Sequence, residues 1–291
     1  MLTETGSPVC PPEWLTLREP ADAAARSAEL AALAGARIGL GLRRHDHLGE
    51  AGPIVVRDLG CGTGSMGRWL APRLPGPQHW VLHDRDPALL RRAAIGLPAV
   101  AADGSAVTVA TACGELGDLD GSALAGTSLV AASALLDMLT AAELERLVDG
   151  CVTACCPVLL ALSVVGEVTL APAEPLDAEL AAAFDAHQRR DGLLGPAAAA
   201  AAAAAFTRRG YAVHVRPTPW RLGPQQAELA EEWLCGWVSA ACAQRPELDE
   251  VVVAYLQRRI AACRAGDLQV VVGHVDVLAL PGGKPSCAAP S

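Results

Sequence analysis

Short apolar runs recur along the chain, separated by stretches long enough to hold a helix. Apolar runs of about four to eight residues between turn residues are typical of buried strands. We therefore predict strands near residues 54–58, 79–84, 107–111, 128–133, 157–164, 211–216 and 269–279. Ala- and Leu-rich stretches with helical spacing lie between most of them. Alternating strands and helices favour a mostly parallel sheet with helices on both faces.

The segment before the first predicted strand reads as helix. Between residues 12 and 49, the stretch EPADAAARSAELAALAGARIGLGLRR has acids early, arginines late and Ala and Leu spaced for one buried face. This charge order suits a helix dipole. We therefore predict an N-terminal helical cap, residues 1–50, that acts as a lid.

Length and composition favour one globular domain with a helical addition. The chain has 291 residues and 52% hydrophobic content, enough to bury a full core. We assign residues 51–281 to that domain, with a substrate-recognition insertion near 166–195 and a helical insertion near 224–265. Residues 282–291 are predicted to form a flexible tail.

The most informative motif is VRDLGCGTG, at residues 56–64. An apolar strand runs into Asp58, and glycines then alternate before the start of a helix. Glycine is needed where the backbone takes positive φ or lies against a ligand, and a helix N-terminus offers unpaired N–H groups. The spacing differs from the dinucleotide fingerprint and from the phosphate-binding loop, and no lysine follows it to hold a phosphate. A nucleotide-like ligand is expected here.

This motif and a second acid carry a family resemblance. Asp58, Gly60, Gly62 and Gly64 match D-x-G-x-G-x-G, and HDRDP places Asp84 at a second strand end, 20 residues after Gly64. That interval lets an acid reach a ribose. The chain thus resembles the class I S-adenosylmethionine (SAM)-dependent methyltransferases. In the alternative interpretation, the glycines serve only the turn of a doubly wound domain.

The resemblance implies a fold, a cofactor and its contacts. The fold would be α/β, a Rossmann-like doubly wound sheet of seven strands, mostly parallel with the last strand antiparallel. Asp84 would hold the ribose. Glu115, in the GEL sequence after the third strand, would contact the adenine, although Asp118 is a rival and Glu115 could be a solvated loop acid. The SAM-binding residues implied are Asp58, Gly60, Cys61, Gly62, Gly64, Asp84, Arg85, Gly114, Glu115 and Ser133.

Acceptor residues are expected near the strand ends. By resemblance, Ser133 and Asp137 border the methyl-transfer site. His187 lies in the polar cluster AFDAHQRRDG and is the first candidate for a general base, because histidine titrates near pH ~6.5; Asp137 is the second. Arg189 and Asp191 of that cluster are predicted substrate contacts, with a solvated helix end as the alternative.

The sequence PTPWRLG, after the sixth strand, supplies two further predicted substrate contacts. Trp220 would form a flat wall and Arg221 an anion contact. Packing of Trp220 in the core explains the tryptophan equally well.

Charge and cysteine spacing narrow the partners. The net charge of −9 favours small-molecule substrates over nucleic acid. The ten cysteines include no C-x-x-C pair, so we predict buried thiols and neither a metal site nor a disulfide scaffold. No signal peptide or membrane-length apolar run is visible, which predicts a cytoplasmic protein. The sequences SALLD, AHQRRD and PWRLG together resemble a bacterial subgroup of the class I family, which implies a bacterial protein. Whether the chain forms a homodimer stays open.

The predicted function is SAM-dependent methyl transfer to oxygen or nitrogen of a small molecule by in-line displacement. Motifs for binding SAM do not identify which of its carbons is transferred. Cyclisation or alkyl transfer from SAM, and non-catalytic SAM binding, therefore remain alternatives.

Overall fold

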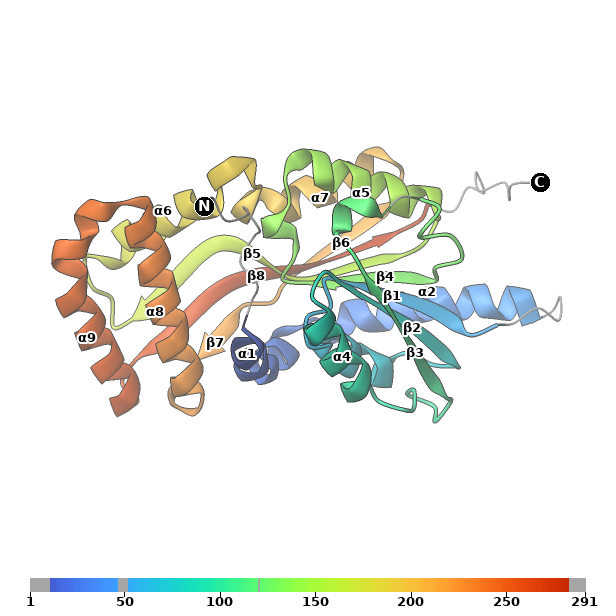
Figure 1. The fold of residues 1–291 in the computed structure, drawn as a ribbon, viewed down its shortest axis with the longest axis horizontal. Coiled ribbons are helices and arrows are strands. Elements are labelled where there is room, and N and C mark those ends of the chain that lie inside the picture. The colour runs from blue at the N-terminus through green and yellow to red at the C-terminus, as the bar shows by residue number, and fades with distance from the viewer. Residues whose placement is uncertain (1–10, 47–51, 120, 283–291) are drawn as a thin grey trace.

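A single mixed sheet organises the chain (Figure 1), whose computed structural model describes residues 11–46, 52–119 and 121–282. In the described part the sheet has eight strands in the order β3-β2-β1-β4-β5-β8-β6, and β7 pairs with β8. The strands are β1 (Ile54–Leu59), β2 (Gln78–Asp84), β3 (Val107–Cys113), β4 (Leu129–Ser133), β5 (Val158–Ala171), β6 (Ala212–Pro217), β7 (Trp220–Leu222) and β8 (Gln269–Leu280).

The strand order confirms the predicted doubly wound fold. β1, β2 and β3 run outward in one direction, and the chain then returns to place β4 beside β1, in parallel register from Val56 opposite Leu129. β8 is antiparallel to β5, β6 and β7, as predicted for the last strand. In such sheets ligands bind where the winding direction changes, outside the carboxyl ends of the strands. That point lies between β1 and β4.

The predicted count of seven strands was one too low. The missed strand is β7, which has three residues between two prolines in the sequence PTPWRLGP. Trp220 and Leu222 are buried and Arg221 is exposed. A run this short has too little alternation to show a strand period, and its place on the sheet is set by pairing with β8.

Helices cover both faces of the sheet (Figure 1). One core cluster joins residues of α2, α3 and α4 to β1 and β2, and another joins α5 and α7 to β4, β5 and β8. The helices of these two layers are α2 (Ala28–Asp46), α3 (Ser65–Leu70), α4 (Pro87–Gly96), α5 (Ala141–Thr153) and α7 (Ala198–Arg208).

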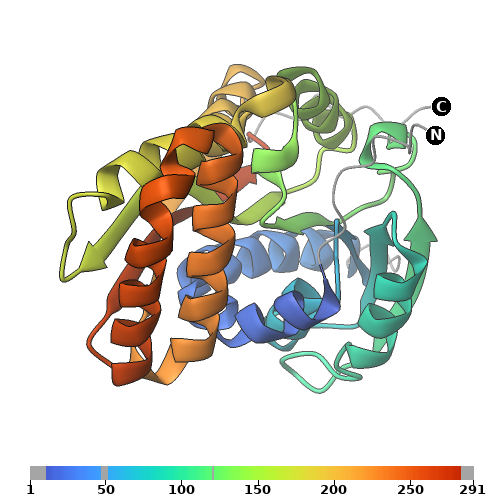
Figure 2. The same cartoon turned by 60° about the vertical axis from the view of Figure 1, so that its left-hand side comes forward.

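A third core cluster lies where β5 and β8 extend beyond their neighbours. There Leu170 and Val270 pack with Trp237 and Leu234, and with other residues of α6 (Asp177–Gln188), α8 (Ala227–Gln244) and α9 (Asp249–Ala265). Figure 2 shows α8 and α9 as a pair of long helices beside the sheet. The first region predicted as an insertion, 166–195, contains the end of β5 and α6. The second, 224–265, contains α8 and α9.

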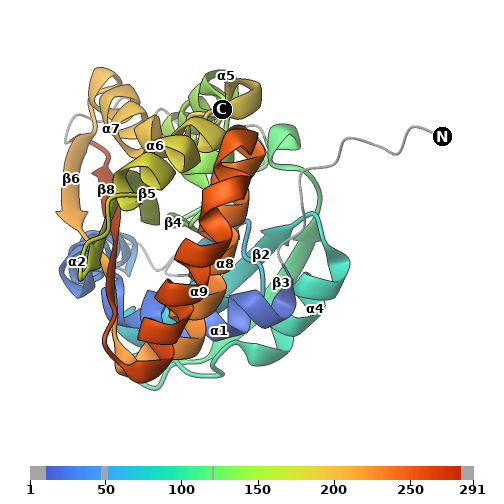
Figure 3. The ribbon, with the colours of Figure 1, turned by 90° about the vertical axis from the view of Figure 1, so that its left-hand side faces the viewer.

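The N-terminal segment forms two helices. α1 (Pro12–Ala25) ends at Arg26, whose ψ of 140° is extended, and α2 begins at Ala28. α2 packs on the sheet, whereas α1 contacts α3, α8 and β7 and lies below α8 in Figure 3. The predicted cap is therefore divided between a core helix and a helix that can reach a ligand site. Residues 1–10, 47–51 and the tail from 283 lie outside the described residues.

Two further sequence predictions concern thiols and membranes. Cys61, Cys151, Cys156 and Cys263 are buried free thiols, as predicted. Cys113 is exposed and Cys155 is disulfide-bonded, which corrects the expectation for those two residues. Among the described residues, no helix is long and apolar enough to cross a membrane, and no group of His, Cys, Asp and Glu is suited to hold a metal ion.

Candidate functional site

A cavity of about 430 Å³ opens at the switch point of the sheet. This volume falls within the range of about 300–1,000 Å³ that is usual for small-molecule sites. Nine of the ten predicted SAM-binding residues line it, the exception being Gly64: Asp58, Gly60, Cys61, Gly62, Asp84, Arg85, Gly114, Glu115 and Ser133. They come from four different strand ends, so the fold brings together residues up to 75 positions apart in the sequence.

The glycine loop between β1 and α3 forms one wall of the cavity. Gly60, Gly62 and Gly64 have φ of +61°, +55° and +88°, values that disfavour residues with a Cβ. A Cβ on Gly64 would lie 3.0 Å from Ala93 of α4, so this glycine allows close packing between α3 and α4. A Cβ on Gly62 would lie 3.2 Å from Leu15 of α1. The turn-only interpretation therefore fits Gly64, whereas Gly60 and Gly62 border the cavity.

Asp84 holds the loop in this conformation from the end of β2. One carboxylate oxygen accepts the N–H of Gly62 at 2.8 Å and the other accepts the N–H of Asp86 at 3.0 Å. Asp86 in turn caps the start of α4, accepting the N–H of Ala88 at 2.7 Å. Asp84 is thus oriented at the cavity wall and retains acceptor capacity for ligand hydroxyls.

Asp58, on β1, is the unusual group of the site. Its side chain is 1% exposed, yet neither carboxylate oxygen has a hydrogen-bond partner in the described structure. Burial raises its pKa to about 7, an effect that the nearby Arg26 opposes. Because a buried acceptor without a donor costs about 1–3 kcal/mol, Asp58 is an acceptor that a cationic ligand group could satisfy.

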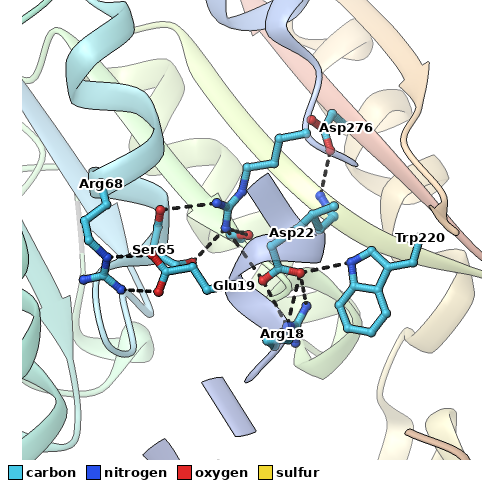
Figure 4. A network of polar contacts seen from close by, with 10 residues as sticks. Arg18, Glu19, Asp22, Ser65, Arg68, Trp220 and Asp276 are labelled. Carbon is cyan, nitrogen blue, oxygen red and sulfur yellow. Dashed lines mark hydrogen bonds and ion pairs between the residues drawn. The ribbon is translucent and has the colours of Figure 1, made fainter. Parts of the chain in front are cut away.

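A further wall comes from α1, which lies within the predicted N-terminal cap, although none of its residues was predicted to line the site. Leu15, Arg18 and Asp22 line the cavity. Asp22 accepts hydrogen bonds from Arg18 Nε at 3.0 Å and from Trp220 Nε1 at 3.0 Å (Figure 4). The available signal was the spacing of Arg18, Asp22 and Arg26, four residues apart on an alanine-rich helix.

Arg26 connects this helix to the start of α3 and to the end of β4. Its Nη2 donates to Ser65 Oγ at 2.9 Å and to Ser133 Oγ at 3.0 Å, and the guanidinium stacks beside Trp69 at 5.8 Å. Arg68 of α3 pairs with Glu19 of α1 at 2.5 Å (Figure 4). The end of α1 is thereby fixed to the glycine loop and to β4.

The residues predicted to bind the acceptor do not line this cavity, except for Ser133. His187 ends α6 and Arg189 pairs with Asp185 at 2.5 Å, while Asp191 lies in the short turn that follows. Burial lowers the pKa of His187, with a smaller effect of Arg190 in the same direction.

The other predicted acceptor residues have mixed placements. Trp220 is 3% exposed and packs in the core against Trp14 and His274, while Arg221 is exposed on β7. Asp137 lies between the cavity-lining residues Leu135 and Met138, and burial raises its pKa.

No protein-family model and no curated protein sequence matches the chain. Among solved structures, a SAM-dependent methyltransferase from Geobacter sulfurreducens in complex with S-adenosyl-L-homocysteine is similar at 16% identity and a TM-score of 0.40, over 92% of this chain and 98% of that one. Magnesium protoporphyrin IX methyltransferase from Synechocystis PCC 6803 has 12% identity and a TM-score of 0.41, over 84% and 81% of the two chains.

A cyclopropane synthase from Mycobacterium tuberculosis is similar at 14% identity and a TM-score of 0.41, over 78% of each chain. These likenesses are distant, and we base no functional inference on them.

Proposed function

We propose that the chain binds SAM in this cavity and transfers its methyl group to oxygen or nitrogen of a small-molecule acceptor. The observation that carries the proposal is Asp58, a buried carboxylate without a donor, placed below a glycine loop at the switch point of the sheet. A nucleoside with a cationic amino-acid arm matches these features. The resemblance of DLGCGTG, HDRDP and GEL to the class I family supports the same ligand.

Each wall of the cavity has a part in holding this ligand. Asp58 suits the ammonium group, Asp84 the ribose hydroxyls and Glu115 the adenine amino group, because each carboxylate can accept from those donors. Gly60 and Gly62 leave room for the cofactor because they carry no Cβ. SAM itself supplies a methyl group activated by a sulfonium, so the protein's main task is positioning.

The acceptor would enter on the side of Ser133 and Asp137. A base is needed only if the acceptor is a hydroxyl or a protonated amine. Of the two predicted bases, Asp137 lies next to cavity residues and has its pKa raised by burial, toward the range that suits a base near neutral pH. His187 remains a prediction that requires α6 to supply the acceptor pocket. We further propose small-molecule substrates without nucleic acid, in a bacterial cytoplasm.

Product analysis tests this function. The protein is incubated with methyl-labelled SAM and a bacterial metabolite extract, with the Gly62→Val variant as a control whose added side chain meets Leu15 and the cavity. The proposal predicts S-adenosylhomocysteine (SAH) and a labelled methylated product with the native protein only. Methylthioadenosine would instead indicate cyclisation or alkyl transfer, and SAM binding without turnover would indicate a binding protein.

A further inference from the structure

The side of the cavity formed by α1 carries a guanidinium group that is fixed in place. Arg18 donates to Asp22 through Nε at 3.0 Å and Nη2 at 3.2 Å, and its guanidinium carbon lies 4.9 Å from the ring centroid of Trp220. The side chain is 14% exposed and lines the cavity. Its Nη1 makes no hydrogen bond within the described chain, so one edge of an oriented, planar donor group remains available.

Arg18 shares its ion-pair partner with a second arginine. Arg18 and Arg26 lie 3.0 Å and 3.9 Å from the same carboxylate, that of Asp22, and both are largely buried. The hydrogen bonds of Arg26 go to the uncharged Ser65 and Ser133. Asp22, the ion-pair partner of Arg18 in the described structure, is therefore shared with a second guanidinium, so a further anion in the cavity would find the charge of Arg18 only partly paired.

No other titratable group near Arg18 forms an ion pair with it in the described structure. Burial lowers the pKa of His274 to about 4, so its ring is neutral, and burial raises the pKa of Asp137. The carboxylate of Asp276 accepts hydrogen bonds from Ser27, Leu162 and Thr218, and it acts on Arg26 through its charge without forming an ion pair. Asp58 lies near Arg26, makes no hydrogen bond to it and itself lacks a donor.

We propose that Arg18 is a carboxylate-binding residue, which uses its free edge to hold an acid group of a ligand in the cavity. A planar guanidinium matches the geometry of a carboxylate. Under the proposed function, on which this inference rests, two carboxylates could reach it. One belongs to the amino-acid arm of the cofactor, and the other would be an acid group on the acceptor.

Calorimetric titrations distinguish these two sources. In the first arm, SAH and its analogue without the carboxylate are titrated into the native protein and into Arg18→Gln. In the second arm, benzoate and benzamide are titrated into the SAH complex of each protein. Arg92→Gln, an exposed arginine of α4, is the control with the same change in charge.

Native protein should bind one carboxylate probe about 10- to 100-fold more tightly than its uncharged counterpart, as charge-assisted hydrogen bonds allow. Arg18→Gln should abolish that preference and Arg92→Gln should retain it. A preference confined to the first arm assigns Arg18 to the cofactor, and one confined to the second assigns it to the acceptor. Arg18→Lys, which can keep the ion pair with Asp22, should show an intermediate preference and guards against misfolding of the glutamine variant.

Two results would contradict the inference in different ways. If SAH binds but Arg18→Gln leaves both preferences unchanged, Arg18 is a structural partner of Asp22 and the carboxylate site is absent, while the proposed function stands. If SAH does not bind the native protein at all, the proposed function fails and the inference fails with it.

Discussion

Asp58 and Asp276 are both buried aspartates of the central sheet, but they differ in their hydrogen-bond partners. Each side chain is 1% exposed, and burial raises the pKa of each. Asp276, on β8, accepts hydrogen bonds from Ser27 N at 2.8 Å, Leu162 N at 2.7 Å and Thr218 Oγ1 at 2.9 Å. Asp58, on β1, accepts none in the described structure.

The difference separates a structural carboxylate from one that we propose binds a ligand. The donors to Asp276 come from the break between α1 and α2, from an irregular point of β5 where Leu162 has φ of +54°, and from the segment before β7. Asp276 therefore holds three chain segments together. Asp58 faces a cavity instead, and nothing in the described chain completes its hydrogen bonds. Burial alone would not have distinguished these two residues.

The largest effect is expected at Asp276. Asp276→Asn can keep an acceptor oxygen for Leu162 N and Thr218 Oγ1, but its amide NH2 then faces the N–H of Ser27, and a buried donor left without a partner costs about 1–3 kcal/mol. We expect the free energy of unfolding to fall by about 3 kcal/mol in urea denaturation, because the two donors that face each other both lose an acceptor and the remaining hydrogen bonds lose their charge assistance. A loss below about 1 kcal/mol would show that Asp276 does not hold these segments together.

Asp58→Asn should have the opposite profile. The amide removes a costly buried charge, so stability should stay the same or rise, whereas affinity for SAH should fall by roughly 10- to 100-fold through loss of a charge-assisted hydrogen bond. Calorimetry and urea denaturation of the same preparation measure both quantities. Destabilisation without a change in affinity would place Asp58 in the structural class with Asp276.

The smallest effect is the dependence of SAH affinity on pH. With a pKa of about 7 in the free protein, Asp58 must lose a proton before it can pair with the ammonium group. Affinity should therefore fall as pH drops below about 7, by at most about tenfold per unit. The groups that act on Asp58 are Arg26, which lowers its pKa most, then Asp84, which raises it, and Arg68, which lowers it.

Asp58→Asn is the control for this titration, since it has no proton to lose and its affinity should be flat between about pH 5.5 and 7.5. In the native protein, the contribution of Asp58 to the free energy of unfolding should change with pH in the opposite direction to SAH affinity. A carboxyl whose pKa is raised on folding favours the folded state at low pH, so the contribution of Asp58 to stability declines from pH ~4 to ~7. If SAH affinity changed with pH equally in the native protein and in Asp58→Asn, the titration would belong to a group other than Asp58.

The fold and the strand-end side of the cavity could be predicted because their signals are local. A strand, alternating glycines and a helix start lie within nine residues, and Asp84 follows at a distance that one strand–helix–strand unit fixes. Glu115 lies shortly after one predicted strand, and Ser133 ends another. Each such residue needed only its own neighbours in sequence to be placed at the carboxyl edge of the sheet.

The α1 side of the site could not be predicted in this way. Arg26 meets Ser133 at a separation of 107 residues, and Asp22 meets Trp220 at 198. The sequence of α1 is that of an ordinary alanine-rich helix, and its charged residues resemble a solvated face. The polar cluster at 185–191 is the opposite case, because its sequence suggested a ligand site. In the structure this cluster does not line the cavity, and Arg189 pairs with Asp185 of the same cluster.

The most direct test of the account is calorimetric titration of the native protein and Asp58→Asn with SAH and, separately, with NAD at neutral pH. The account predicts that SAH binds one site on the native protein and binds Asp58→Asn at least about tenfold more weakly, while NAD binds neither. Binding of NAD without binding of SAH at millimolar concentration would contradict the account.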